Sequence, residues 1–202
     1  MAKLSIGKSL DRNLPKEAFF RNIRVTPTLR AKFSSDFGRL TLTRTISPLT
    51  CTIAVGENVK EINVITIELK KEDAESKVLE AIAKGLPFKI IFLLKFDGRE
   101  CLAVYHTKLF MTKWQKETSE KLNLQALDLD ELWKRVVSRI SGIEVRESET
   151  IDAAIERDSE RQKLERQIEI LESKIRKEKQ FNRQIEMSGE LKKMKIGLKQ
   201  VK

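Results

Sequence analysis

The sequence predicts an α+β fold, in which a sheet with covering helices is followed by a basic helical arm. Apolar and polar residues alternate at 65–70, an apolar run follows at 88–96, and helical periodicity separates the two. The segment 149–202 contains no proline and is rich in residues that favour helices. We therefore expect an α+β core domain at 1–146 and a helical arm at 147–202, folded as a coiled coil or a helical hairpin.

The segment 61–114 is predicted as a strand, a helix and two further strands. The alternation at 65–70 is the period of a strand with one buried face. An amphipathic helix follows, with acidic residues in its first turn and a glycine at its end. The run 88–96 is too short to cross a membrane and suits a central strand that is buried on both faces. An Asp-Gly pair then predicts a hairpin turn into a strand at 101–111.

Two short helices are predicted ahead of this segment, at 15–23 and 27–37. A proline stands at the first helical position of each, where its missing N–H costs no hydrogen bond. Threonines alternate with apolar residues at 40–46, which predicts a strand with a β-branched outer face, and a second strand is predicted at 50–55. From the second helix onward, the predicted order is helix, three strands, helix, strand.

This order is similar to the common core of restriction-endonuclease-like nucleases, whose third strand carries an acidic residue, any residue and a lysine. Glu68, Leu69 and Lys70 stand at that place, directly before the helix. The resemblance implies that Glu68 holds Mg²⁺ while Lys70, two residues on and therefore on the same strand face, orients or activates the attacking water. That family also places an aspartate at the start of the second strand. Here the nearest carboxylates are Glu57 and Glu61.

Three interpretations of this segment stay open. The first is an active nuclease with catalytic Glu68 and Lys70 and with Glu57, Glu61 and Glu68 as metal ligands. The second is an inactive scaffold of the same kind, and the third is an unrelated α+β sheet on which these side chains face solvent. Mg²⁺ is the one cofactor that the sequence suggests. The sequence has no glycine-rich phosphate loop and no dinucleotide fingerprint, which argues against nucleotide-driven functions.

The rest of the core is predicted from shorter patterns. The polar segment 114–125 is expected to be a loop, and an apolar stripe around Trp133 predicts a helix that ends at Gly142 and closes the core. His106 is the only histidine and is expected to be structural, because it has no nucleophile or metal-binding partner at a suitable spacing.

The net charge of +10 is distributed unevenly along the chain. Residues 1–49 carry 10 basic and 3 acidic side chains, residues 50–160 carry 17 and 21, and residues 161–202 carry 13 and 6. Contacts with nucleic acid are therefore expected at the two basic ends. The amino-terminal candidates lie on or between the first two helices, where a solvated face is the alternative: Arg21, Arg24, Arg30, Lys32 and Arg39.

Cysteine use and hydropathy indicate the compartment. Cys51 and Cys101 have no cysteine or histidine at metal-ligand spacing, so we expect reduced core residues. The amino terminus lacks an apolar signal region, and no apolar run approaches the roughly 20 residues of a membrane helix. The expectation is a cytoplasmic protein that makes no membrane contact.

The arm carries two short heptad patterns that do not share a register. The first is formed by Leu164, Ile168, Leu171 and Ile175, and the second by Leu191, Met194, Leu198 and Val201. Because the pattern breaks between them, a hairpin or an interrupted coiled coil is favoured over one long zipper. The apolar stripe has to be buried against itself, in a homodimer, or against another protein.

Basic residues in the arm are the main candidates for nucleic-acid binding. They would contact phosphates without reading sequence, and the alternative is the solvated flank of a coiled coil. The candidates are Arg176, Lys177, Lys179, Arg183, Lys192, Lys193, Lys195 and Lys199.

Several segments, which together span nearly the whole chain, resemble a prokaryotic family whose domain has no known function. They are PKEAFF, ISPLT before GENVKEINVITIELK, LPFKIIFLL, LDLDELW and KIRKEKQFNRQIEMSGELKKMK. Members of that family are often encoded beside a DNA methyltransferase and a helicase, in loci that look like restriction or phage-defence systems. The resemblance implies a DNA-directed system of several subunits and assigns no catalytic residue.

The leading hypothesis is an accessory subunit of a prokaryotic restriction or phage-defence system that binds DNA, a partner protein, or both. Its expected partners are DNA, contacted through the basic ends, and a helicase or methyltransferase. One alternative is an enzyme, a Mg²⁺-dependent nuclease that uses Glu68 and Lys70. The other is an adaptor that binds only proteins.

Overall fold

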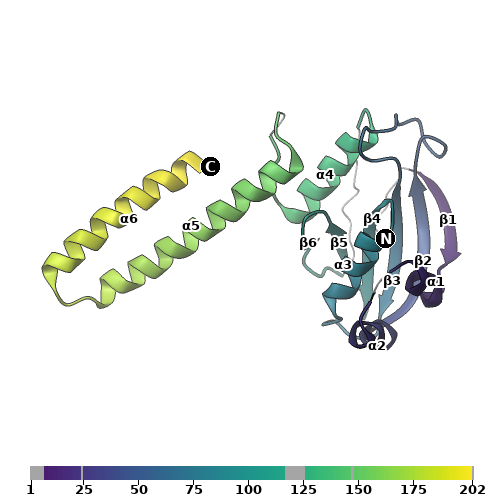
Figure 1. Cartoon of the computed structure of the whole chain (residues 1–202), viewed down its shortest axis with the longest axis horizontal. Helices are drawn as coiled ribbons and strands as arrows, with labels where there is room; N and C mark the ends of the chain where they lie inside the picture. The colour runs from purple at the N-terminus through teal and green to yellow at the C-terminus, as the bar shows by residue number, and fades with distance from the viewer. Residues whose placement is uncertain (1–6, 24, 117–125, 147, 202) are drawn as a thin grey trace. The chain divides into compact units, whose positions relative to one another are not determined.

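The computed structural model describes residues 7–23, 25–116, 126–146 and 148–201. The chain divides into two compact units, Met1–Gly142 and Ile143–Lys202, which we call the sheet unit and the hairpin unit. The sheet unit contains every strand of the described residues together with four helices, and the hairpin unit contains two long helices (Figure 1).

Six strands form one mixed sheet in which the spatial order follows the chain order. They are β1 (Lys8–Asn13), β2 (Phe37–Ile46), β3 (Ile62–Leu69), β4 (Lys89–Phe96), β5 (Arg99–Tyr105) and β6 (Leu109–Met111). All neighbours pair antiparallel except β3 and β4, which are parallel. The exception arises because a helix connects β3 to β4, and such a crossover returns the chain in the same direction.

Four helices belong to the sheet unit: α1 (Lys16–Asn22), α2 (Pro27–Asp36), α3 (Ser76–Gly85) and α4 (Leu129–Ser141). The α+β class predicted from the sequence is confirmed. Each of the four helices was also predicted, because proline, acidic or Asp capping residues mark their starts and apolar stripes mark their buried faces.

One face of the sheet is covered by α1, α2 and α3. Alternate residues of the central strands, such as Ile65, Ile67 and Phe92, pack there with Val78 and Ile82 of α3 into one buried cluster. The intervening residues of each strand face the other side of the sheet. There, α4 packs against β5 and β6, with Trp133 only 1% exposed, and its indole Nε1 donates to His106 Nδ1 at 3.2 Å.

The predicted strand at 50–55 is wrong. Ser47 to Thr50 form a turn in which Thr50 Oγ1 accepts from the Ser47 N–H at 2.9 Å and donates to Thr45 O at 2.9 Å. The following residues pass the start of α4 and make one isolated bridge, Ala54 with Asp128. Between α2 and α3 the described chain therefore has two strands instead of three.

The structure differs from the expectation at two further strands. The strand expected at 101–111 is interrupted at His106–Lys108, so that it forms β5 and β6. β1 was not predicted, because its residues carry charges and no apolar alternation: all six are exposed at the edge of the sheet. Most of the loop expected at 114–125 lies outside the described residues, which resume at 126.

The hairpin unit consists of α5 (Ile151–Lys177) and α6 (Phe181–Val201), which lie side by side in opposite directions (Figure 1). Thr150 caps α5 by accepting from the Ala153 N–H at 3.2 Å. Ile168 is 7% exposed, and a Cβ on Gly197 would lie 3.8 Å from Leu164 Cδ2, so the first heptad pattern faces α6. In the part of the chain that the structure describes, no helix combines the length and apolar composition needed to span a membrane.

Candidate functional site

The turn of the hairpin unit is built from local hydrogen bonds. Glu178 ends α5, and its Oε1 accepts the backbone N–H groups of Lys179 and Gln180 at 2.8 and 2.9 Å. Gln184 Nε2 donates to Glu178 O at 2.7 Å. These contacts give the three residues between α5 and α6 a defined conformation, although none of them is in a helix.

Five exposed cations surround this turn, and we call them the turn cluster: Lys174, Arg176, Lys177, Lys179 and Arg183. Glu178 is the only acidic residue from 173 to 183. The hydrogen bonds from the Gln180 and Lys179 N–H groups, with the nearby charge of Arg183, lower the pKa of Glu178 despite its partial burial. Its carboxylate is therefore ionised and bound to backbone, so the turn keeps a net positive charge. Four members of the cluster, all except Arg176, line a shallow hollow of about 560 Å³.

A second basic group lies along α6. Lys192, Lys195 and Lys199 line a separate groove of about 370 Å³, together with Leu191 and Ile196. Lys195 Nζ lies 2.8 Å from Glu172 Oε1 of α5, and this contact lowers the pKa of Glu172. Lys195 is therefore partly neutralised within the hairpin.

The structure thus separates the eight residues predicted to bind nucleic acid. Lys177, Lys179 and Arg183 line the hollow at the turn, and Arg176 is exposed beside them at the end of α5. The three lysines of the α6 groove form another set, and Lys193 is exposed outside both hollows.

The sheet unit has a hollow of its own on the part of the sheet where polar side chains replace apolar ones. Its volume is about 440 Å³, and Val64, Leu93 and Leu102 contribute apolar lining. Its polar lining comes from five strands: Ser9, Asp11, Arg39, Thr41, Thr43, Arg44, Thr66, Glu68, Lys95 and Glu100. We call it the sheet hollow.

A row of alternating charges crosses the sheet hollow. Exposed Glu68 is the register partner of Lys95 in the parallel β3–β4 pair, and Lys95 is the partner of Glu100 in the β4–β5 hairpin. Lys95 Nζ lies 3.1 Å from Glu100 Oε1, whose side chain is only 9% exposed. Arg39, on β2, lines the same hollow. Cross-strand pairs of opposite charge stabilise a sheet, and the same row offers an acid and a cation to a ligand.

The structure does not bring Lys70 to Glu68. The Lys70 N–H donates to Asp36 O at 2.8 Å, and Lys70 Nζ donates to Ser34 O at 3.3 Å, at the carboxyl end of α2. Lys16 Nζ donates to the same carbonyl, and burial together with the charge of Lys70 lowers the pKa of Lys16. The two lysines thus neutralise the last carbonyls of a helix, where a cation is favourable.

The other proposed metal ligands are also separated from Glu68. Glu57 lies in the loop before β3, and Glu61 Oε1 accepts from Asn63 Nδ2 at the opposite end of β3 from Glu68. Seven residues of extended chain between Glu61 and Glu68 span about 23 Å. Among the residues that the structure describes, no three histidine, cysteine, aspartate or glutamate side chains are grouped so as to hold a metal ion.

The amino-terminal basic residues are dispersed over α1, α2 and β2. Arg30 lies over the Phe20 ring, 4.5 Å from its centroid, so part of its side chain packs on an aromatic face. Arg39 faces the sheet hollow, Arg21 and Lys32 are exposed, and Arg24 lies outside the described residues.

The sequence patterns did not predict some residues of these sites. The run at 88–96 was interpreted as buried on both faces, although Lys95 shares its strand face with Leu93 and so lines the sheet hollow. Glu100, two residues after a predicted turn, gave no separate signal. Lys174 belongs to the turn cluster, and only the position of the turn could have revealed it.

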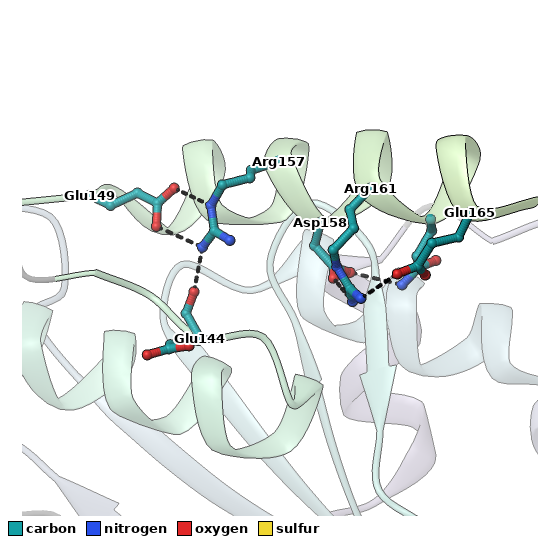
Figure 2. A network of polar contacts seen from close by, with 7 residues as sticks. Glu144, Glu149, Arg157, Asp158, Arg161 and Glu165 are labelled. Atoms are coloured by element: carbon teal, nitrogen blue, oxygen red, sulfur yellow. Dashed lines mark hydrogen bonds and ion pairs between the residues drawn. The ribbon is translucent and has the colours of Figure 1, made fainter. Parts of the chain in front are cut away.

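The base of the hairpin unit carries a polar network (Figure 2). Arg157 Nε and Nη2 donate to the two carboxylate oxygens of Glu149 at 2.9 and 3.0 Å, and Nη2 also donates to Glu144 O at 2.6 Å. The guanidinium of Arg157 lowers the pKa of Glu149 to about 2. Arg161 bridges Asp158 at 2.7 Å and Glu165 at 3.0 Å. Because Glu149, Asp158 and Glu165 are each paired with an arginine, this network serves to fix the start of α5.

The family model for a domain of unknown function named DUF4391 matches residues 7–198. No curated protein and no solved structure gave a significant match. The matched segment includes residues of both the sheet unit and the hairpin unit. The chain therefore belongs to the DUF4391 family.

Proposed function

We propose that this protein binds the phosphate backbone of DNA through the turn cluster, as an accessory subunit of a prokaryotic DNA restriction or phage-defence system. The observation that supports it best is the five exposed cations around a turn whose only carboxylate is bound to backbone N–H groups. Such a cluster suits contacts that position a protein on DNA without reading its sequence.

The assignment to a restriction or phage-defence system, and the choice of a protein partner, rest on the family resemblance seen in the sequence. In a locus that also encodes a methyltransferase and a helicase, those enzymes perform the chemistry on DNA. A small basic subunit would then hold one of them on the duplex. We propose the helicase or the methyltransferase as its protein partner, and co-elution of purified partner with this chain, in buffers with and without duplex DNA, tests that part separately.

The DNA-binding test is fluorescence anisotropy of a labelled duplex, titrated with the full chain between about 50 and 200 mM salt. The test variant replaces Lys177, Lys179 and Arg183 by glutamine. Each lost phosphate contact reduces the slope of log K against log salt by about 0.9, so the slope should fall by about 2.7. The affinity at low salt should fall ten- to hundredfold.

The matched control replaces Lys77, Lys113 and Lys116, three exposed lysines of the sheet unit, by glutamine. This control removes the same charge from the chain and should leave the slope unchanged. If both triple variants lose affinity equally, the net charge of the chain explains the binding and the turn cluster is not the site. Failure of the full chain to bind at 150 mM salt would favour the adaptor that binds only proteins.

A second candidate function is the Mg²⁺-dependent nuclease, supported by the exposed Glu68 in the sheet hollow. β3 carries Glu68 near its end, and α3 and a parallel strand follow it, as expected for the restriction-endonuclease-like core. Because the ammonium of Lys70 is bound to Ser34 O at the end of α2, the cation beside Glu68 is Lys95. Metal-dependent nicking of a supercoiled plasmid should disappear in Glu68→Gln and Lys95→Met and persist in Lys70→Met. Equal plasmid integrity with wild type and Glu68→Gln would exclude this function.

A further inference from the structure

The outer face of α6 carries an apolar stripe with nothing packed on it among the described residues. Phe181, Ile185 and Ile196 are 72%, 57% and 52% exposed. Their spacings of four and eleven residues return to the same side of a helix, and Lys192 and Lys199 continue the same stripe. Apolar side chains aligned on one exposed face, with charges between them, are typical of a surface that binds another helix.

A stripe of glutamates runs beside it on the same face of the hairpin. Glu165, Glu169 and Glu172 are separated by four and three residues and so share one side of α5. The 2.8 Å contact between Lys195 and Glu172 spans the two helices and shows that the acidic stripe adjoins the basic one. Between residues 165 and 172, this face of the hairpin thus presents an acidic α5 beside an α6 that is basic and apolar. Arg161 and Arg176 stand at the two ends of the glutamate stripe.

We propose that this face binds a second copy of the same chain. In a two-fold arrangement whose axis runs along the hairpin, α6 of one copy packs on α5 of the other. Lys192 of each copy then lies opposite Glu169 of its partner, since α5 and α6 run antiparallel and the two residues sit at the same level. A face with an acidic half beside a basic half is complementary to itself under this rotation. No other partner needs to be assumed to match both halves.

The dimensions of the face suit a small dimer. α6 has 21 residues, so the face is about 30 Å long, and two adjacent helices are about 20 Å wide. The resulting area of about 600 Å² per copy lies near the lower end of the range for specific protein interfaces. We therefore expect a reversible dimer that dissociates at micromolar concentrations.

The arrangement extends the proposed DNA-binding function without depending on it. A two-fold axis along the hairpin brings both turns to the same end of the four-helix bundle. Two turn clusters then face one polyanion together, and the second contact becomes intramolecular. The dimer can be tested without DNA, so failure of either proposal is distinguishable from failure of the other.

The test is sedimentation equilibrium of the full chain from about 1 to 100 μM, with charge reversals at the facing pair. Wild type should approach twice the chain mass at the upper end. Lys192→Glu alone and Glu169→Lys alone should each weaken the dimer at least tenfold. The combined variant Lys192→Glu with Glu169→Lys should restore it, because the reversed charges again oppose one another across the two-fold axis.

Two controls keep the result interpretable. Lys193→Glu changes the next residue of α6, which lies outside the stripe, and should leave the dimer unchanged. Circular dichroism of every variant should give the helix content of wild type, which excludes unfolding as the cause of dissociation. A monomeric wild type at 100 μM, or single reversals that leave the dimer intact, would overturn the proposal. So would a combined variant that remains dissociated.

Discussion

The two units of this protein are stabilised in different ways. In the sheet unit, strands and helices that are far apart in sequence bury a cluster in which Phe37, Ile67 and Phe92 have no exposed surface. In the hairpin unit, two neighbouring helices share a narrow apolar seam. Ion pairs flank it: Arg161 pairs with Asp158 and Glu165 within α5, and Lys195 of α6 pairs with Glu172 of α5. The sheet unit depends on burial of apolar area, and the hairpin unit depends more on helix propensity, capping and charge.

This difference indicates where each unit tolerates change. A buried cluster loses stability with almost any substitution, whereas exposed lysines on a helix can be gained or lost at little cost to folding. The candidate DNA-binding residues are of the second kind. A basic surface on a helical hairpin can therefore change its partner without affecting the core, and the following predictions test how far this separation holds.

The largest effect is expected for Trp133→Ala in α4, which removes a side chain that is 1% exposed. Loss of its packing and of the hydrogen bond to His106 should cost about 3–5 kcal/mol. Chemical denaturation measures this loss in the free energy of unfolding, and hydrogen exchange of the β4 and β5 amides measures it independently. Met111→Ala, at a side chain that is 42% exposed, is the control and should change stability by less than about 0.5 kcal/mol. A small loss in Trp133→Ala would mean that α4 is not part of the core.

A smaller loss is expected for Asp130→Ala, at the first turn of α4. The Asp130 carboxylate accepts the backbone N–H groups of Val59 at 2.7 Å and Asn58 at 3.0 Å. Burial alone would raise the pKa of Asp130, but these hydrogen bonds lower it, so the ionised form is the bound one. Removing the acceptor leaves these donors unpaired, so the free energy of unfolding should fall by about 1–3 kcal/mol. Thermal unfolding measures this loss. Asp73→Ala, at an exposed aspartate before α3, should leave the melting temperature unchanged.

The smallest effect is a pH dependence confined to the start of α5. Arg157 lowers the pKa of Glu149 from 4.5 to about 2, so ionised Glu149 stabilises the fold above pH 4.5 and loses this effect as the pH falls toward 2. Hydrogen exchange of the first turn of α5 should accelerate over that range. In Glu149→Gln it should be fast already at neutral pH, and Glu156→Gln, at an exposed position on the same helix, should behave as wild type. A titration midpoint near 4.5 in wild type would contradict the Glu149–Arg157 pair.

Local patterns in the sequence predicted most of the fold. The alternation at 65–70, the apolar run at 88–96 and the capped apolar stripe around Trp133 correspond to β3, β4 and α4. Failures occurred where tertiary contacts override local preference. The segment 50–55 has the β-branched and apolar composition of a strand, but the hydrogen bonds of Thr50 and the bridge of Ala54 to Asp128 hold it at the start of α4.

The candidate sites were less predictable than the fold, because they depend on which strands are neighbours. Spacing places Glu68 and Lys70 on one strand face, but β3 ends at Leu69, and the helix end at Ser34 then attracts the ammonium of Lys70. The pairing of Glu68 with Lys95 follows from the parallel β3–β4 register, which no local pattern contains. The turn cluster could be predicted as basic, while its grouping required the position of the turn.

The edge strand β1 has a consequence for how the protein behaves at high concentration. Asp11 adopts a positive φ of 46°, and the pairing with β2 is irregular between Ser9 and Arg12. A bulged strand that exposes Lys8 and Arg12 is a poor template for a further strand. Without it, the ten residues of β2 would form an open edge of the sheet. By covering the edge of β2, the strand β1 prevents edge-to-edge aggregation. A chain shortened to begin after Asn13 should therefore form intermolecular β-structure on storage.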